Sequence, residues 1–303
     1  MNAIAALIVA ASLWAADRTL RFSRWLFYGY GNYCKLTPLP EGATRVTMHR
    51  SVKAGPGSHA FLWIPSVRRF QTHPFTLVSN NPAEFVIAGH EGFTKELHNL
   101  AIQSPKAMRR AAIEGPYGNV PSTADFDKVI LIAGGSGATF TLALAMDWLR
   151  HQRTSDGNGN KILEFIWTIK NKDYLSWFEH DLQELQSSPW VSLKIHVTAP
   201  KICKEDISPP MTSASEEQRL FSQNSNLPAL VRQNSLRSIT ELGRPDIDIV
   251  VKQVVDNTHR DGRILVAASG PGSLLASTRM AVKGCMSSDA ASIHLHTEEF
   301  DGF

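Results

Sequence analysis

Cysteine is scarce in this sequence. Its 303 residues hold three cysteines, Cys34, Cys203 and Cys285, which lie far apart and never form a CxxC pair. An odd, sparse set of this kind fits a reducing compartment and neither a zinc site nor a disulfide framework. Net charge is small as well, +3 from 31 basic and 28 acidic side chains, and it does not favour a nucleic-acid partner.

Motifs of several enzyme classes are also missing. The chain contains no GxSxG or HExxH element, and its one close histidine pair, His294 and His296, has a spacing that is more often structural than metal-binding. What is present is an ordinary globular composition, 43% hydrophobic and 19% charged, which excludes wholesale disorder. The length predicts two domains of about 100–200 residues each.

The N-terminus carries the longest uncharged run. Residues 3–16 have no charge, and the arginines Arg18, Arg21 and Arg24 follow them. The run is shorter than the roughly 20 residues that a spanning helix needs, and no basic residue precedes it as in a signal peptide. Aromatic residues among the arginines are typical of a membrane interface: Trp14, Trp25, Phe27, Tyr28, Tyr30 and Tyr33. We therefore predict the trailing half of a transmembrane segment; the alternative is a buried amphipathic helix.

Short apolar runs separated by turn residues follow, up to about Tyr117. Closely spaced strands of this kind predict a small antiparallel barrel. The predicted strands are residues 46–48, 60–64, 75–78, 85–88 and 110–113, and one helix, residues 94–104, interrupts them.

The run His73-Pro74-Phe75-Thr76 lies between two of these strands. Pro74 removes a backbone donor, which suits an edge strand or a strand end. An aromatic ring, a hydroxyl and an imidazole at a sheet edge suit a planar ligand with a polar rim. A proline-broken strand without a ligand is the alternative.

A second candidate site is Gly92-Phe93-Thr94, directly before the predicted helix. Thr94 is predicted to be the N-cap. A glycine followed by a helix start offers free N–H groups and a positive dipole end to a phosphate. Ordinary capping without a ligand is the alternative.

The pattern changes at Asp127. The β-branched run 128–133 predicts a strand buried on both faces of a parallel sheet. It leads into Gly134-Gly135-Ser136-Gly137-Ala138-Thr139 and then into an apolar helix from Phe140 to about His151, which is the dinucleotide-binding arrangement. Phe140 stands where the third glycine of GxGxxG would be.

Further strands and helices continue this alternation. The predicted strands are 163–169, 191–197, 263–268 and 293–296, and the predicted helices are 175–186 and 274–284. Residues 199–242 break the rhythm with a polar composition that predicts a disordered insert.

The order of the motifs resembles a known family. His-Pro-Phe-Thr is followed by Gly-Phe-Thr-Lys, Gly-Pro-Tyr-Gly at 115–118, the glycine turn at 134–139, Gly-Arg-Pro at 243–245, Ser-Gly-Pro-Gly at 269–272 and an acidic-aromatic end. From about Ala15 to Phe303 this is similar to the cytosolic half of fungal ferric reductases, relatives of the NADPH oxidases. The resemblance implies a two-domain ferredoxin–NADP reductase-like fold, in which an antiparallel FAD-binding barrel precedes a Rossmann-like, parallel-sheet NADPH domain.

The resemblance also implies roles for particular residues. His73, Pro74, Phe75 and Thr76 would bind the flavin, and Gly92, Phe93 and Thr94 the FAD pyrophosphate. Gly134, Gly135, Gly137 and Thr139 would bind the NADPH pyrophosphate, with Gly270 and Pro271 also in the cofactor site and Lys170 and Arg244 at the 2′-phosphate. Ser269 would lie at the nicotinamide, where the family often has cysteine, and Phe303 would shield the flavin. Ser269, Ala138 and Phe140 depart from the family pattern and bring NADPH use into question.

The activity implied is that of an NADPH-dependent ferric-chelate reductase module, passing hydride to FAD and then single electrons toward haem and ferric iron. The haem helices would belong to a missing or separate membrane domain. The domains expected are a truncated transmembrane segment at 1–35, the FAD barrel at 36–123 and the NADPH domain at 124–303. The family places the chain at the plasma membrane with its catalytic half in the cytoplasm. Alternatives are a superoxide-forming oxidase module and a non-catalytic remnant.

Overall fold

The computed structural model describes residues 3–29, 32–154, 161–199, 239–286 and 291–299. Two compact units form, one chiefly from residues 1–121 and the other chiefly from residues 122–301. They are called the first and second unit below. Cys203 and Phe303, and most of the predicted insert, lie outside the described residues.

The chain begins with a single long helix, α1 (Ala3–Gly29). Its stretch Ala3–Leu20 is long and apolar enough to cross a membrane, and none of that stretch is buried. The prediction of a run too short to span was therefore wrong, because the helix continues without a break through Asp17 and Arg18. The alternative of a buried amphipathic helix is also wrong, since Leu7 and Leu13 are 70% and 67% exposed.

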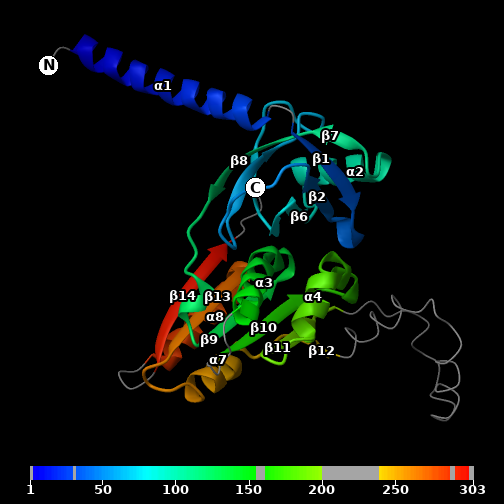
Figure 1. Cartoon of the computed structure of the whole chain (residues 1–303), viewed down its shortest axis with the longest axis vertical. Helices are drawn as coiled ribbons and strands as arrows, with labels where there is room; N and C mark the ends of the chain where they lie inside the picture. The colour runs from blue at the N-terminus through cyan, green and yellow to red at the C-terminus, as the bar shows by residue number, and fades with distance from the viewer. Residues whose placement is uncertain (1–2, 30–31, 155–160, 200–238, 287–290, 300–303) are drawn as a thin grey trace, which may run out of the picture. The chain divides into compact units, whose positions relative to one another are not determined.

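Beyond α1, the described part of the first unit holds two antiparallel sheets and the helix α2 (Figure 1). The sheet β5-β6-β2-β1-β7 consists of β1 (Tyr33–Pro38), β2 (Thr44–Met48), β5 (Ser79–Asn80), β6 (Ala83–Ile87) and β7 (Met108–Arg110). The sheet β4-β3-β8 consists of β3 (His59–Trp63), β4 (His73–Thr76) and β8 (Ala112–Tyr117). Helix α2 (Phe93–Gln103) buries Leu97 and Ala101 against the core, as the spacing of its apolar residues predicts.

Two details of this unit differ from the sequence prediction. The strand predicted at 110–113 is two strands, because the chain changes sheets at Ala111: β7 pairs with β1, and β8 pairs with β3. Strands β1 and β5 were not predicted. In β1 only alternate residues are apolar, and Cys34 and Leu36 are the ones that enter the core.

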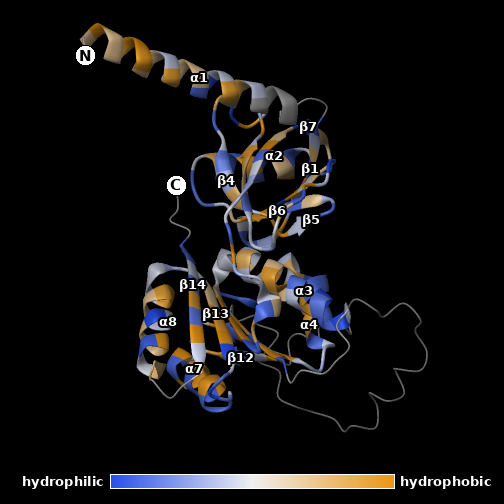
Figure 2. Cartoon of the chain, turned by 60° about the vertical axis from the view of Figure 1, so that its left-hand side comes forward, coloured by the Kyte–Doolittle hydropathy of each residue, from blue (hydrophilic) through white to orange (hydrophobic). Residues whose placement is uncertain are grey.

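The second unit is built on a six-stranded parallel sheet with the order β12-β11-β10-β9-β13-β14. Its strands are β9 (Lys128–Gly134), β10 (Ile162–Ile169), β11 (Val191–Val197), β12 (Thr240–Leu242), β13 (Arg263–Gly270) and β14 (Ser292–Glu299). Helices α7 (Ile247–Asp256) and α8 (Gly272–Cys285) cover one face, and α3 (Ala138–Thr154) and α4 (Glu179–Gln186) lie on the other. Figure 2 shows the mostly hydrophobic strands between these helices.

Three corrections concern this unit. The helix predicted at 175–186 is a 3-10 segment, Lys172–Trp177, followed by α4, because Phe178 leaves helical geometry and packs against Trp167. The last residues of the predicted insert are ordered as β12, which pairs with β11. Helix α7 was missed, although Asp246 caps it and Ile247, Val251 and Val255 recur at helical spacing on its buried face.

Candidate functional sites

The His-Pro-Phe-Thr run forms β4, an edge strand of the sheet β4-β3-β8, as the proline indicates. His73 pairs with Leu62 and Phe75 with Ala60, and the fourth residue, Thr76, is buried. The first three side chains are half-buried, so the strand presents an imidazole, a proline ring and a phenyl ring at an accessible edge.

Phe93 brings the two candidate flavin segments together. Its ring stacks on His73 at 4.4 Å between centroids, and it lies nearly parallel to Phe75 at 6.1 Å. His73, Phe75 and Phe93 thus form an aromatic cluster that joins β4 to the start of α2. The two motifs are separate in the sequence, with 20 residues from His73 to Phe93. Only the fold brings them together into one surface.

His73 is the polar member of this cluster. Its Nε2 atom is buried and has no hydrogen-bond partner among the described residues. Burial, with a smaller contribution from the nearby Arg68 cation, lowers the pKa of His73 below its usual value. The imidazole is therefore neutral at pH 7, and a buried nitrogen of this kind suits a polar ligand atom.

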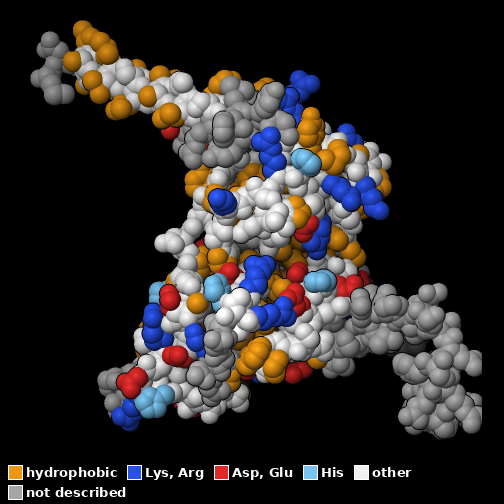
Figure 3. All heavy atoms as spheres, in the orientation of Figure 1, with side chains coloured by type: hydrophobic (Ala, Val, Ile, Leu, Met, Phe, Trp, Pro, Cys, Tyr) orange, Lys and Arg blue, Asp and Glu red, His pale blue; other side chains and the backbone are white. Residues whose placement is uncertain are grey.

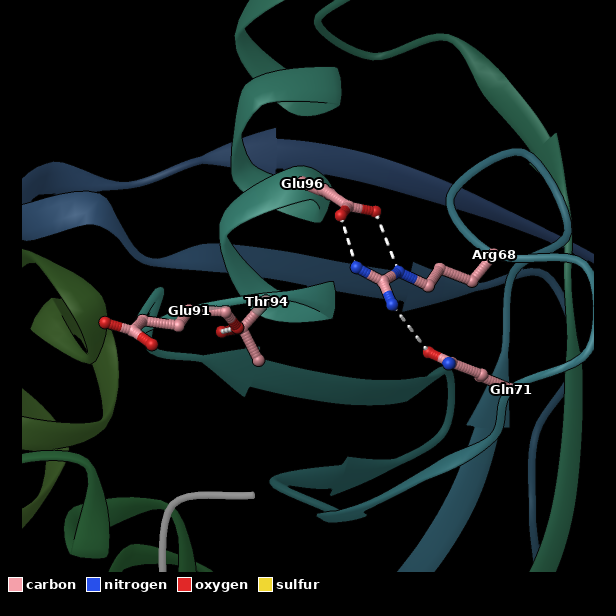
Figure 4. A network of polar contacts seen from close by, with 5 residues as sticks. All are labelled: Arg68, Gln71, Glu91, Thr94 and Glu96. Atoms are coloured by element: carbon pink, nitrogen blue, oxygen red, sulfur yellow. Dashed lines mark hydrogen bonds and ion pairs between the residues drawn. The ribbon is translucent and has the colours of Figure 1, made fainter.

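The start of α2 differs from the prediction. Gly92, with φ of +57°, occupies the N-cap position, and Thr94 lies inside the helix. The Thr94 hydroxyl accepts from the His90 N–H at 2.9 Å and donates to the Glu91 carbonyl at 3.2 Å. The prediction of Thr94 as N-cap was therefore wrong: its side chain fixes the loop before the helix (Figure 4).

Arg68 was not predicted as a site residue. Its guanidinium donates to both carboxylate oxygens of Glu96, in the first turn of α2, and to Gln71 (Figure 4). A Cβ on Gly92 would lie 4.0 Å from Arg68 Nη2, so the cation stands beside the helix start. The hydrogen bond from Arg68 lowers the pKa of Glu96. A helix N-terminus beside a guanidinium suits a phosphate group, which would compete with Glu96 for Arg68. No local sequence pattern pointed to Arg68, because its loop and α2 meet only in the fold.

In the second unit, β9 runs into a 3-10 turn, Gly135–Gly137, and then into α3. The turn packs closely against the end of β13. A Cβ on Gly137 would lie 2.2 Å from the Ser269 carbonyl oxygen, and one on Gly134 would lie 2.7 Å from Pro271 Cδ. These two glycines are required for packing. Gly135 has a φ of +54°, and no atom of the described residues lies within 4 Å of its Cβ position, so its backbone is open to a ligand.

Two side chains hold this turn in place. Thr139 donates from its hydroxyl to the Ser136 carbonyl at 3.0 Å, and Trp167 donates from its indole N–H to the Gly135 carbonyl at 2.9 Å. Trp167 was not predicted as a site residue, because it comes from the next strand, β10. Phe140 is fully buried and stacks on His296 at 5.6 Å. It is therefore a core residue and does not obstruct the turn.

The remaining predicted residues lie at the carboxyl ends of the parallel strands. Lys170 follows β10 and Arg244 follows β12, and both are exposed. The strand β11 lies between them: the Ala199 N–H donates to the Lys170 carbonyl, and the Gly243 N–H donates to the Val197 carbonyl. Two strand spacings separate their backbones by about 10 Å.

Ser269 and Gly270 end β13 beside β9, where the chain order of the sheet reverses. In open α/β sheets this crevice is the usual ligand site. Ser269 is fully buried, and its hydroxyl has no hydrogen-bond partner among the described residues. Together with the close-packed glycines, this orphaned hydroxyl fits a ligand that supplies a polar atom at the crevice.

The fold defines a class, the two-domain proteins with a ferredoxin reductase-like fold. Solved structures with this fold match across the chain. The CS-b5R domains of human Ncb5or in an NAD+ form match with a TM-score of 0.58 at 15% identity, covering 88% of this chain and 69% of that one. A ferredoxin NADP+ reductase from Neisseria gonorrhoeae matches with a TM-score of 0.53 at 10% identity, covering 88% and 97%.

Sequence comparison identifies the family. Residues 31–121 match the FAD-binding domain model, and residues 126–283 match the ferric reductase NAD binding domain model. The chain belongs to the ferric reductase family and contains an FAD-binding domain followed by a ferric reductase NAD binding domain.

Curated relatives agree with this assignment. Ferric reductase transmembrane component 5 of Saccharomyces cerevisiae is 28% identical over 282 residues, which are 90% of this chain and 38% of the relative. A probable ferric reductase transmembrane component of Candida albicans is 29% identical over 291 residues, 90% of this chain and 41% of the relative. The chain thus spans about two fifths of the length of these relatives.

Proposed function

We propose that this chain is the dehydrogenase module of an NADPH-dependent ferric-chelate reductase, held at the cytoplasmic face of the plasma membrane by α1. The first unit would hold FAD, which when bound supplies the chemistry that links hydride transfer from NADPH to single-electron transfer toward haem in a separate membrane domain and then ferric iron. The observation that carries the proposal is the pair of sites described above. Each contains a buried polar atom, His73 Nε2 or Ser269 Oγ, that has no hydrogen-bond partner in the part of the chain that the structure describes. Each lies in a unit that matches a cofactor-binding domain model, FAD-binding for the first and NAD binding for the second.

The residues of the chain would bind and orient the two cofactors and exclude water from them. In the first unit, the edge strand β4 would take the flavin against His73, Pro74 and Phe75, with the start of α2 at the pyrophosphate. In the second unit, Gly135 would admit the NADPH pyrophosphate to the backbone at the start of α3. The exposed cations Lys170 and Arg244 would meet the 2′-phosphate. Ser269 would supply its hydroxyl to the nicotinamide.

The membrane location rests on α1. Arg18 lies near the end of its apolar stretch Ala3–Leu20, and Arg21 and Arg24 follow that stretch. A basic flank on this side favours a helix whose C-terminal end faces the cytoplasm. The curated relatives are named as transmembrane components, which supports the same location.

The test is reduction of a soluble dye by NADPH after reconstitution with FAD, with anaerobic bleaching of the flavin followed in the same cuvette. We expect bleaching and turnover. Bound FAD that NADPH does not bleach would contradict the nicotinamide site around Ser269. Failure to bind FAD at all would contradict the module as a whole and leave the non-catalytic alternative. Superoxide formation without reduction of ferric chelates, once a haem partner is added, would favour the oxidase alternative.

A further inference from the structure

The charge of this protein is divided unevenly between its two units. Residues 1–121 contain 13 Lys and Arg against 6 Asp and Glu, whereas residues 122–303 contain 18 against 22. The overall net charge of +3 therefore hides a basic first unit and an acidic second unit. On the face shown in Figure 3, Lys and Arg dominate the charged side chains of the first unit, while both signs mix on the second.

Part of this surplus gathers at one end of the first unit, where the chain leaves α1. Arg110 pairs with Tyr33 across strands β7 and β1, and the Ala111 N–H donates to the Asn32 carbonyl. Tyr33 also accepts from the His49 N–H, which places Arg50 next to it.

The loop between β3 and β4 lies at the same end. Trp63 pairs with Ala112, just beyond Arg110, and its indole N–H donates to the Arg69 carbonyl at 2.8 Å. This places Arg69 and Phe70 beside the start of β8.

We name these five residues, Tyr33, Arg50, Arg69, Phe70 and Arg110, the basic rim. All five side chains are exposed, and the Phe70 ring is 96% exposed. None of the three arginines has a carboxylate partner among the described residues. A fully exposed phenyl ring is unfavourable in water, and a phenyl ring at the same end of the unit as arginines without carboxylate partners suits a surface that offers both anions and apolar material.

The position of α1 identifies that surface. The helix has 27 residues and is about 40 Å long, close to the roughly 40–45 Å thickness of a bilayer with its headgroups. Its C-terminal end would then lie at headgroup level. Tyr33 follows Gly29 by four residues, which reach at most about 14 Å. The basic rim is therefore confined to the neighbourhood of the lipid headgroups.

We infer that the basic rim docks on an anionic lipid surface, with Phe70 entering the headgroup layer and Arg50, Arg69 and Arg110 contacting acidic headgroups. The contact would hold the first unit flat against the membrane, in addition to the tether that α1 provides. This inference rests on the proposed membrane location of α1. It is independent of the proposed electron transfer, because no rim residue belongs to either candidate cofactor site.

The test uses the full chain inserted through α1 into lipid nanodiscs of phosphatidylcholine, alone or mixed with phosphatidylserine. Amide hydrogen exchange is compared for residues 64–72 and 108–110. We expect exchange in these segments to slow only in the anionic nanodiscs, and the difference to vanish at high salt because screening removes the attraction. Each arginine of the basic rim should shift the docking equilibrium roughly fivefold toward the membrane-bound state.

Charge reversal sharpens the test. The double variant Arg69→Glu/Arg110→Glu should abolish the lipid-dependent protection. The control is the double variant Lys252→Glu/Lys283→Glu, at exposed positions of α7 and α8. The control changes the net charge by the same amount and should leave the protection intact. Phe70→Ser should weaken docking about tenfold without reversing charge. Equal exchange in both lipids, or equal loss in the control pair, would overturn the inference, and so would failure of the chain to remain in the nanodisc.

NADPH-driven dye reduction, measured in the same nanodiscs, separates this inference from the proposed function. Lost turnover with intact lipid-dependent protection contradicts the function and supports docking. Intact turnover without protection contradicts docking alone.

Discussion

The two units build their candidate sites by different means. In the first unit, side chains make the site: the rings of His73, Phe75 and Phe93 and the guanidinium of Arg68 meet at a sheet edge and a helix start. In the second unit, the backbone makes the site. Gly134 and Gly137 allow β9 and β13 to end in contact, with no room for a Cβ.

This difference has a consequence for mutation. A half-buried side chain at an edge strand, such as Phe75 at the margin of the core, can be removed at a smaller cost to the core than a fully buried one, because the ladder of backbone hydrogen bonds remains. A glycine between two packed strand ends cannot be enlarged without moving backbone. We therefore expect ligand binding and stability to separate in the first unit and to fall together in the second.

The largest expected effect is that of Gly137→Ala. Its Cβ would lie 2.2 Å from the Ser269 carbonyl oxygen, so the backbone of β13 or α3 must shift. We expect a loss of about 2–3 kcal/mol in the free energy of unfolding, measured by chemical denaturation. Gly284→Ala is the matched control, because its Cβ meets no described atom within 4 Å and the residue lies in α8. A Gly137→Ala protein as stable as the control would contradict the close-packed turn.

The next effect concerns the cations of the second unit. Lys170→Ala and Arg244→Ala should each lower kcat/KM for NADPH by about tenfold or more, because each removes a charged hydrogen bond of about 1.5–3 kcal/mol to the 2′-phosphate. Activity with NADH should change little, since that cofactor lacks the phosphate. Lys172→Ala, at an exposed position two residues beyond Lys170, serves as the control. Equal losses with both cofactors would show that the two cations do not read the 2′-phosphate.

In the first unit, Phe75→Ala should lower FAD affinity by about three- to tenfold, the value of one aromatic contact, while the apoprotein stays folded. Thr76→Ala should also reduce flavin occupancy with little loss of stability. Flavin absorbance after gel filtration and circular dichroism of the apoprotein measure the two quantities separately. Full retention of FAD in both variants would contradict the placement of the flavin on β4.

The smallest expected effect is on the pH dependence of the free energy of unfolding, and it can be compared directly between the two units. Burial lowers the pKa of His73 in the first unit and of His196 in the second. The unfolded chain therefore binds these protons more readily than the folded one, so stability is retained above about pH 6.5 and falls as pH drops toward the lowered pKa values.

The slope of the unfolding free energy against pH, measured by urea unfolding between pH 7 and pH 5, reports the protons taken up on unfolding. His73→Gln and His196→Gln should each reduce this uptake by up to one proton. An unchanged slope in both variants would show that burial does not lower the pKa of either histidine in the folded state.

Much of the fold could be predicted from the sequence because its signals are local. Residues 128–133 form a buried strand because a β-branched run suits a parallel sheet, and 134–139 form a turn because glycine tolerates the conformations and contacts that the turn needs. The errors have tertiary causes. Phe178 ends a helix because it packs on Trp167, and Ala111 divides a strand because its neighbours pair with different sheets.

The sequence by itself determined the order of the two domains, the family and the motifs that supply candidate cofactor residues, because each depends on residue types at short spacing. Only the tertiary structure decided which of these residues meet. It stacked Phe93 on His73, placed Arg68 beside Gly92 and turned Phe140 into the core. It also collected the basic rim from positions between 33 and 110. The physical reason is that such contacts depend on strand pairing and packing between segments far apart in the chain, which no local pattern of residues encodes.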